Sequence, residues 1–260
     1  MTSLSDHHAS SIQKLLYIGD SGTGKTGSLV SLIEAGYKLR ILDLDNGLDA
    51  LRNFALRAEC DLSKVDFETV CDTYIPTSEG LIIKGVPKAF VRTTKLLTKW
   101  SDDTYPYQWG EDTIFVLDSL TRLGRCAFEW AKGMNPSAKE PRTWFYTAQR
   151  ACEDMIALLT GKDFQTNVIV ISHVNMIELK DGTTKGYPSA IGVALSKVVA
   201  TYFNTMILAE RSGSGISVKR TINTLPTALI DLKNPAPFKL DAALPLDTGL
   251  ATVFEKLKET

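Results

Sequence analysis

The residues best suited to chemistry form one short stretch, GDSGTGKT, between positions 19 and 26. The stretch follows the apolar run KLLYIG and precedes GSLVSLIEAG, so it joins a predicted strand to a predicted helix. Glycines at this spacing let successive backbone N–H groups converge on phosphate oxygens, and the helix N-terminus adds a favourable dipole. In this context the pattern G-x4-G-K-[ST] predicts a nucleotide site, with an ordinary glycine-rich turn as the alternative. The predicted binding residues are Gly19, Asp20, Ser21, Gly22, Thr23, Gly24, Lys25, Thr26 and Gly27.

A magnesium site is predicted beside the phosphates. Lys25 is expected to reach the terminal phosphates, and the Thr26 hydroxyl can ligate Mg²⁺. The run TIFVLDS is an apolar strand that ends in Asp118, and this carboxylate is expected to hold the metal through a water molecule. Taken alone, Asp118 could instead cap the N-terminus of a helix. Paired with the glycine-rich loop, the metal role is favoured.

Two further positions could act on a bound phosphate. The segment LDLDNGLDALR carries Asp43 and Asp45, which we expect to face opposite sides of a strand, so that only one points at the nucleotide. A carboxylate there could orient and deprotonate an attacking water molecule. His173 ends the run NVIVISH and is a candidate sensor of the γ-phosphate. The alternatives are a pair of solvated strand-end acids and a structural histidine.

The elements that must position these residues alternate along the chain. Apolar runs recur at KLLYIG, LRILDLD, VDFETVC, TIFVLDS and NVIVISH, several of them separated by segments long enough for helices. This alternation predicts an α/β fold with a mostly parallel sheet covered by helices on both faces. Two of the helices are predicted to end at Gly36 and Gly161.

The C-terminal part of the chain has a different character. The segment MIELKDGTTKGYP contains a DG turn signal and predicts a hairpin or a mobile loop, followed by a helix in SAIGVALSKVVATYF. Three later segments, NTMILAERSG, GISVKRTIN and TALIDLKN, are predicted to extend the sheet as antiparallel strands. The tail GLATVFEKLKE is predicted to be a closing helix.

Length and composition favour one domain. With 260 residues, 44% of them hydrophobic, the chain can bury a large core, and we expect a flexible segment 1–11 followed by a single domain over 12–260. The 29 Lys and Arg nearly balance the 30 Asp and Glu, so any site for a polyanion must be local. Four widely spaced cysteines are interpreted as reduced thiols, and no export signal or membrane span is predicted, so we expect a cytoplasmic protein.

The residues around these motifs resemble the RecA-type branch of the P-loop ATPases. The run IFVLDSLTRL is similar to that family's strand ending in Asp-Ser, and ILDLDNGLDAL is similar to its second-strand segment. The resemblance implies the cofactors ATP and Mg²⁺, a catalytic acid at Asp45 and, at Arg52, a side chain stacked on adenine. A solvated helix charge is the alternative for Arg52.

Other segments extend the resemblance from Ile12 to about Phe238. By position, NVIVISHVN implies that His173 senses the γ-phosphate, although the family more often has Gln there. DLKNPAPF resembles a segment whose lysine reaches a neighbouring subunit's nucleotide, which implies Lys233. An exposed turn lysine is the alternative. The predicted catalytic residues are therefore Asp45, Lys25, His173 and Lys233.

Two segments are candidates for contact with nucleic acid. In RCAFEWAKGMNPSAKEPRTWFY, cations alternate with aromatic residues, and the position matches the family's first DNA-binding loop; KGYPSAIGVALSK resembles its second. Cations could contact phosphates while aromatic rings stack on unpaired bases. The alternative is a solvated loop beside core aromatics. The predicted DNA-binding residues are Lys132, Lys139, Arg142, Lys185 and Lys197.

The compact chain, with its Trp-rich stretch KWSDDTYPYQWGEDTIFVLDSL, looks most like the phage-encoded, Sak-type minimal RecA-like ATPases of single-strand annealing. This resemblance implies an ATP-dependent protein of recombination or annealing that binds single-stranded DNA and hydrolyses ATP, with DNA stimulation, between subunits of a ring or filament. A single-strand-binding protein is a further possible partner, and no membrane is involved. Two alternatives remain: a KaiC-like ATPase acting on a protein, and a nucleotide-stabilised scaffold with negligible hydrolysis.

Overall fold

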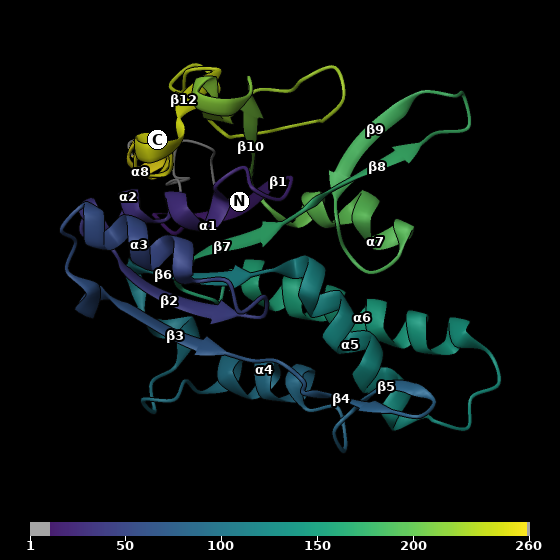
Figure 1. Cartoon of the computed structure of the whole chain (residues 1–260). Helices are drawn as coiled ribbons and strands as arrows, with labels where there is room; N and C mark the ends of the chain where they lie inside the picture. Colours follow the sequence, from purple (N-terminus) through teal and green to yellow (C-terminus); the bar gives the residue numbers. More distant parts are fainter. Residues whose placement is uncertain (1–10, 259–260) are drawn as a thin grey trace, which may run out of the picture.

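The structure, a computed structural model, describes residues 11–258. The segment predicted to be flexible, 1–11, lies outside these residues except for Ser11. Within the described part, eight strands form one sheet in the order β12-β11-β10-β1-β7-β6-β2-β3, with helices packed on both faces (Figure 1). The predicted fold class, a mostly parallel α/β sheet with antiparallel strands added from the C-terminal part, is confirmed.

The sheet strands and the two separate hairpins have the following bounds. The strands are β1 Lys14–Gly19, β2 Lys38–Asp43, β3 Val65–Thr69, β4 Tyr74–Thr77, β5 Gly80–Ile83, β6 Gly110–Asp118, β7 Thr166–Ser172, β8 Val174–Glu178, β9 Thr184–Pro188, β10 Thr205–Ser212, β11 Lys219–Asn223 and β12 Ala243–Pro245.

The helices are distributed between these strands. The α-helices are α1 Lys25–Ser28, α2 Val30–Glu34, α3 Asp49–Arg57, α4 Ala89–Thr98, α5 Leu120–Met134, α6 Pro141–Thr160, α7 Val193–Val198 and α8 Leu246–Lys258. Short 3-10 helices are η2 Leu62–Lys64, η3 Pro106–Gln108, η4 Val199–Tyr202 and η5 Gly215–Ser217. Helix α2 stops before Gly36, whose φ of 98° is left-handed, and Gly161 caps α6, as the sequence predicts.

Each central strand supplies both cores of the molecule, because successive side chains of a strand point to opposite faces. On β1, Leu16 and Ile18 join the core under α4, α5 and α6, whereas Leu15 and Tyr17 join the core under α1, α2, α3 and α8. Strands β6 and β7 divide in the same way. Near-continuous burial on both faces explains why these strands read as unbroken apolar runs in the sequence.

The C-terminal strands differ from their prediction in two respects. Strand β10 is parallel to β1, in the register Leu15↔Thr205, and only β11 and β12 are antiparallel. The segment TALIDLKN forms no regular strand and contributes one isolated bridge, Met206↔Lys233. Prolines on both sides of this segment, Pro226 and Pro235, lack the N–H that a longer ladder needs.

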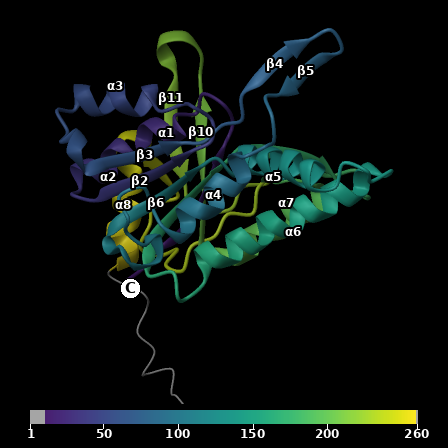
Figure 2. The same cartoon turned by 90° about the horizontal axis from the view of Figure 1, so that it is seen from below.

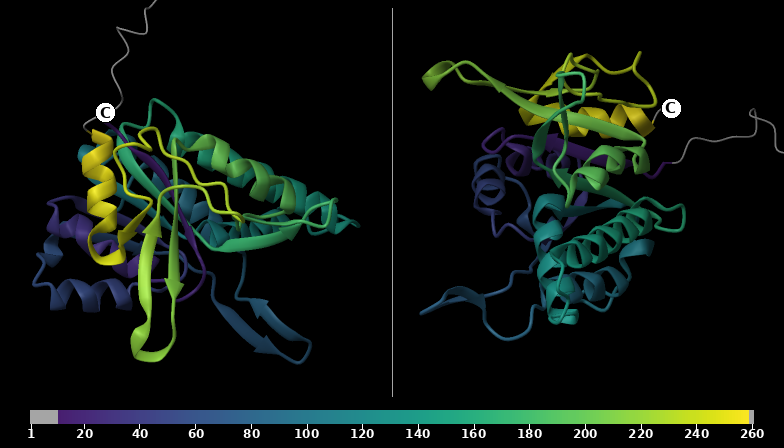
Figure 3. Two further views of the ribbon diagram at one scale, coloured as in Figure 1. Left: turned by 90° about the horizontal axis from the view of Figure 1, so that it is seen from above. Right: turned by 90° about the vertical axis from the view of Figure 1, so that its right-hand side faces the viewer.

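Two hairpins lie outside the sheet. Strands β8 and β9 pair antiparallel around Asp181 and Gly182, so the predicted hairpin is present, but the helix that follows is shorter than predicted and becomes the 3-10 turn η4. Strands β4 and β5 form a second hairpin that projects from the body of the molecule (Figures 2 and 3). No helix among residues 11–258 is long and apolar enough to cross a bilayer.

Replacing Phe115 with alanine should destabilise the fold strongly, because this ring is fully buried on β6 and packs against Trp100, Trp109 and Phe164. The expected loss is about 3–5 kcal/mol in the free energy of unfolding, measured by urea denaturation followed by tryptophan fluorescence. The matched control is Phe238→Ala, since Phe238 is 83% exposed and should change the free energy little. Equal losses in both variants would contradict this packing.

Candidate nucleotide-binding site

The parallel register brings the ends of four strands to one edge of the sheet. Asp43 of β2 pairs with Asp118 of β6, and Asp118 in turn pairs with Ile171 of β7. Ile18 of β1 pairs with Ser172, so the glycine-rich loop and His173 leave neighbouring strands at the same level. Parallel α/β sheets hold ligands at the carboxyl ends of their strands, and the polar residues predicted to act on phosphate gather there.

The glycine-rich loop after β1 needs glycine for both backbone and packing reasons. Gly22 and Gly24 have left-handed φ angles of 76° and 95°, which most side chains disfavour. A Cβ on Gly24 would also lie 2.6 Å from Leu246 Cδ2 of α8, and one on Gly19 would lie 2.5 Å from the Ala209 carbonyl of β10. The loop is therefore enclosed by C-terminal elements on one side.

The Lys25 side chain folds back over this loop. Its Nζ donates hydrogen bonds to the carbonyls of Gly19 (2.7 Å) and Asp20 (2.9 Å). Burial lowers the pKa of Lys25, and the carboxylates of Asp118, Asp20 and Asp45 oppose that shift. A cation held this way can turn from carbonyl oxygens to phosphate oxygens without leaving the cavity, because both are oxygen acceptors.

Thr26 and Asp118 meet at the base of the cavity. The Thr26 hydroxyl donates to Asp118 Oδ2 at 2.7 Å, and Asp118 is buried at the end of β6. The pKa of Asp118 is raised to about 6, mainly by burial and also by Asp45 and Asp43, against the lowering effects of Thr26 and Lys25. A hydroxyl and a carboxylate are hard oxygen donors of the kind that Mg²⁺ prefers, so these residues fit the predicted metal. Helix α5 is capped by Ser119, which removes the N-cap alternative for Asp118.

Asp43 and Asp45 point to different surroundings, but not for the reason expected from strand alternation. Residues two apart on a strand share a face. Here β2 ends at Asp43 and the chain bends, so the two carboxylates separate. Asp43 turns inward and accepts hydrogen bonds from the backbone N–H groups of Asp45 (3.1 Å) and Gly47 (3.3 Å) and from Thr69 (3.2 Å). Burial raises the pKa of Asp43, and these hydrogen bonds lower it.

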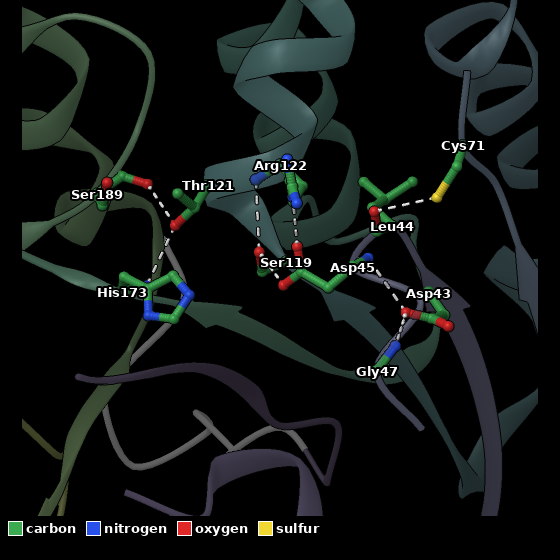
Figure 4. A network of polar contacts seen from close by, with 10 residues as sticks. All are labelled: Asp43, Leu44, Asp45, Gly47, Cys71, Ser119, Thr121, Arg122, His173 and Ser189. Atoms are coloured by element: carbon green, nitrogen blue, oxygen red, sulfur yellow. Dashed lines mark hydrogen bonds and ion pairs between the residues drawn. The ribbon is translucent and has the colours of Figure 1, made fainter. Parts of the chain in front are cut away.

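Asp45 lines the cavity and is held by two residues that the sequence reasoning missed. Ser119 Oγ donates to Asp45 Oδ2 at 2.8 Å, and Arg122 Nε donates to Asp45 Oδ1 at 3.0 Å (Figure 4). Ser119 is the N-cap of α5 and Arg122 lies in its first turn, directly after Asp118. The available signal was the run DSLTR, because residues three positions apart on a helix lie on the same side of it.

His173 lies on the opposite side of the cavity, between β7 and β8. Its backbone N–H donates to the Thr121 hydroxyl at 3.2 Å, and Thr121 donates to the Ser189 carbonyl at 3.1 Å (Figure 4). Burial lowers the pKa of His173, as does Lys25, whereas Asp45 raises it. Lys25, Asp45 and His173 are thus close enough to influence one another's charge.

These groups enclose a cavity of about 710 Å³ at the carboxyl edge of the sheet. The volume lies within the roughly 300–1,000 Å³ range of small-molecule sites. Its lining is formed by Ser21, Gly22, Gly24, Lys25, Thr26, Gly27, Asp45, Gly47, Ala50, Asp118, Thr121, Arg122, Arg125, Ile171 and His173.

Two residues from the predicted site lie elsewhere. Arg52 is exposed on the far side of α3 and lines a separate cavity together with Asp43, Leu62 and Phe67. The side of α3 that reaches the P-loop cavity presents Ala50 instead. Lys233 pairs through its backbone with Met206, which lies next to Leu16 in the middle of the sheet rather than at the cavity edge.

The predicted first DNA-binding loop connects α5 to α6. Lys132, Lys139 and Arg142 are exposed there. Trp144 instead packs in part against Phe128, and its indole N–H donates to the Asn135 carbonyl. Phe145 and Tyr146 remain 48% and 68% exposed. The cations and two of the three aromatic rings are thus available to a ligand.

The predicted second DNA-binding segment comprises β9 and α7. Lys197 is exposed on α7, whereas Lys185 of β9 forms an ion pair with Asp231 at 2.7 Å. The β8–β9 hairpin and the α5–α6 connection both project to the right in Figure 1, the direction in which the parallel strands point. They extend from the edge of the sheet that carries the cavity.

The buried charge of Asp118 should make the protein's stability depend on pH. Its folded pKa of about 6 exceeds the ordinary 3.8, so the folded state holds this proton more tightly than the unfolded chain does. Stability from this group therefore falls as pH rises from about 4 to about 6, and stays reduced above that range. Asp118→Asn should raise the free energy of unfolding at pH 8 by about 1–3 kcal/mol.

The comparison is made by urea denaturation of both proteins without nucleotide or metal, between pH 4 and pH 8. The advantage of Asp118→Asn should be smallest at pH 4 and reach its full value above about pH 6. A difference that does not change with pH would show that the substitution acts through packing and not through charge.

Known proteins resemble this chain in sequence profile and in fold. The profile of the AAA domain family matches residues 11–236. The RadB recombinase has a similar structure, with a TM-score of 0.51 and 16% identity over 95% of this chain and 92% of that one. A KaiC-like protein from Pyrococcus horikoshii OT3 gives a TM-score of 0.44 with 13% identity, covering 83% of this chain and 80% of that one.

The flagellar accessory protein FlaH of Methanocaldococcus jannaschii also gives a TM-score of 0.44, with 10% identity over 90% of this chain and 84% of that one. No curated protein matches the sequence. The similarity to RadB is a similarity of fold. The family profile covers most of the chain, and it includes the glycine-rich loop, Asp118 and His173. The protein belongs to the AAA domain family and is an ATPase with a RecA-like P-loop fold.

Proposed function

We propose that this ATPase binds single-stranded DNA in recombination or strand annealing, and that ATP binding and hydrolysis control its affinity for DNA. The observation that carries the proposal is the placement of exposed cations and aromatic rings on segments that project in the direction in which the parallel strands point, toward the side of the molecule that holds the nucleotide cavity. A RecA-like fold shared with a recombinase is consistent with it.

The phosphates of ATP would lie against the loop from Gly19 to Thr26. Lys25 would exchange its two carbonyl contacts for oxygens of the β- and γ-phosphates. Thr26 would hold Mg²⁺ directly and Asp118 would hold it through water. The metal, when bound, supplies positive charge that neutralises the phosphate oxygens.

Asp45 is proposed as the general base. Its carboxylate lines the same cavity as Lys25 and Thr26, so it can orient the attacking water molecule and accept its proton as the γ-phosphate transfers. Asp43 does not compete for this role, because backbone N–H groups and Thr69 occupy its carboxylate.

His173 is proposed to sense the γ-phosphate from the other wall of the cavity. Its backbone carbonyl accepts from the Ser189 N–H at 2.8 Å, and the Ser172 hydroxyl donates to the Ser189 carbonyl at 3.2 Å. Ser189 follows directly after β9, so a shift of His173 would act on the β8–β9 hairpin and the segment before α7. Nucleotide state would thereby change the proposed DNA surface through ordering of these segments.

The DNA surface would combine phosphate contacts from Lys132, Lys139 and Arg142 with base stacking on exposed aromatic rings. Lys197 would add a contact from α7, and Lys185 would do so after leaving Asp231. Three to five cations bind weakly on one subunit, so we propose a ring or filament that repeats them along a strand. Lys233, away from its own subunit's cavity, would reach a neighbour's nucleotide in such an assembly.

Under this proposal, the functional analogue is the Sak-type group of minimal RecA-like annealing proteins from phages, and a single-strand-binding protein is a further partner.

A second candidate function is that of an ATPase that acts on a protein. One observation favours it: the projecting β4–β5 hairpin exposes Leu81 (73%), Ile82 (50%) and nearby Val86 (67%) to solvent. Exposed apolar side chains gathered on one projection are typical of a protein-binding surface.

Asp45→Asn should strongly reduce turnover while ATP still binds, because an amide cannot accept the proton from water. The expected fall in kcat is about 10²- to 10⁴-fold, the usual contribution of a general base. Phosphate release and binding of a fluorescent ATP analogue provide the two measurements. Asp49→Asn, an exposed carboxylate on the adjoining helix α3, is the control and should retain its kcat. Unchanged turnover in Asp45→Asn would refute the proposed base.

Binding to a fluorescent single-stranded oligonucleotide should require Mg²⁺ and a slowly hydrolysed ATP analogue, and should weaken steeply with salt. Lys139→Ala and Arg142→Ala should each reduce the slope of log K against log salt by about 0.7, the value for one phosphate on a single strand. Lys162→Ala is the control, since it lies beyond the opposite end of α6.

Lys25→Ala should weaken ATP binding by about 10- to 150-fold, because charged hydrogen bonds to phosphate are lost, and should remove DNA binding as well. If no nucleotide state binds DNA while ATP is still hydrolysed, the DNA proposal fails. The exposed β4–β5 hairpin would then be the place to search for a protein partner.

A further inference from the structure

The carboxylate of Asp45 is held at both oxygens by residues of one helical turn. Ser119 Oγ donates to Oδ2 at 2.8 Å, and Arg122 Nε forms a salt bridge with Oδ1 at 3.0 Å (Figure 4). Among residues 11–258, Ser119 and Arg122 are the residues that donate hydrogen bonds to the Asp45 carboxylate. The two contacts therefore define the orientation of this side chain.

The backbone around Asp45 does not fix the carboxylate by itself. Residues 44–47 follow the end of β2 and precede α3 without regular structure, and Asn46 has a left-handed φ of 54°. One backbone hydrogen bond, from Leu44 N–H to the Asp118 carbonyl at 2.6 Å, ties this bend to β6. Beyond it, the side-chain contacts from α5 link Asp45 to the strand that ends in Asp118.

We propose that Arg122 is a positioning residue for ATP hydrolysis, which orients the Asp45 carboxylate together with Ser119. The inference rests on the proposed role of Asp45 as general base. It assigns to Arg122 an action through Asp45 and no contact with the reacting atoms.

With both hydrogen bonds in place, the Asp45 carboxylate can still accept a hydrogen bond from the attacking water. Each carboxylate oxygen can accept two hydrogen bonds, and the two contacts occupy one acceptor position on each oxygen. A second position therefore stays available for the attacking water. Arginine suits this function better than lysine, because its planar guanidinium presents N–H groups in fixed directions, whereas an ammonium rotates freely.

The exposure of Asp45 and Arg122 allows a positioning role to be distinguished from a purely structural one. The Arg122 side chain is 59% exposed and that of Asp45 is 28% exposed. Exposed ion pairs contribute little to stability, so removing Arg122 should leave the fold intact. Misplacement of a reacting group by about 1 Å, in contrast, can cost 10²-fold in rate. A positioning role would therefore lower the rate of hydrolysis, whereas a structural role would lower the stability of the fold.

The first experiment compares Arg122→Ala and Arg122→Lys with the unaltered protein. We expect Arg122→Ala to lower kcat by about 10- to 100-fold while KM and the affinity for a fluorescent ATP analogue change less than about threefold. Arg122→Lys should recover only part of the rate, and methylguanidinium at millimolar concentration should raise the rate of Arg122→Ala. The melting temperature should stay unchanged in both variants.

The matched control is Arg92→Ala. Arg92 forms an ion pair with Glu68 at 2.6 Å, and its side chain is 56% exposed. The Arg92→Ala variant therefore loses a comparable ion pair far from the cavity. Its kcat and KM should equal those of the unaltered protein. A fall in kcat of similar size in Arg92→Ala, or a fall in Arg122→Ala that follows its melting temperature, would overturn the proposal.

A double substitution separates this inference from the function on which it rests. In the Asp45→Asn background, Arg122→Ala should cause no further loss of turnover, because both changes remove the same action. Full additivity of the two losses would overturn the positioning role. If Asp45→Asn alone leaves turnover unchanged, the proposed base fails. If Asp45→Asn strongly reduces turnover and Arg122→Ala does not reduce it, only the role of Arg122 fails.

Discussion

Parallel pairing of β2 and β6 is the constraint on which the site depends. Placing Asp43 opposite Asp118 ends the two strands at one level, and the adjoining pairs extend that level to β7 and β1. The segment that follows each of these strands then places one functional group at the cavity: the glycine-rich loop, the bend with Asp45, the first turn of α5, and His173. A slip of one residue in this register would turn every side chain of the slipped strand to the other face and separate these groups.

The electrostatics of the cavity follow from that convergence. Asp118, Asp43 and Lys25 are all buried, and burial opposes the charge of each. Hydrogen bonds reduce the energetic cost of burying these charges: Thr26 donates to Asp118, backbone N–H groups donate to Asp43, and loop carbonyls accept from Lys25. A site organised in this way is less stable without its ligand, because the bound phosphates and metal complete the charge balance.

Local motifs predicted the parts of the site that depend on local geometry. The glycine-rich loop and Asp118 each combine a strand with a short fixed sequence, and both were identified from the chain alone. The partners of Asp45 were not, because Ser119 and Arg122 lie more than 70 residues away and reach it only through the β2–β6 pairing. Arg52 was assigned by resemblance to a family position, which does not show the side of α3 on which it lies, and in the structure it lines a separate cavity.

Prediction of the fold was limited in the same way, because local features were recognised and those that depend on distant strands were not. Buried central strands were recognised as apolar runs, whereas the direction of β10 and the existence of β12 depend on which strand lies beside them. Strand β12 has three residues, and only Leu244 is buried, so its sequence carries almost no strand signal. TALIDLKN is rich in apolar residues, yet it lies between prolines and forms a single bridge, to Met206 of β10.

The enclosure of the glycine-rich loop by Ala209 and Leu246 has a consequence for how the protein is made. Strand β1, among the first segments to be synthesised, lies between β7 and β10 and cannot complete its pairing until residues 205–209 have been translated. Contacts this distant in sequence form slowly, because the intervening chain must first close a long loop. The nascent chain thus carries its glycine-rich loop without the support of Ala209 and Leu246 until β10 and the start of α8 have been synthesised.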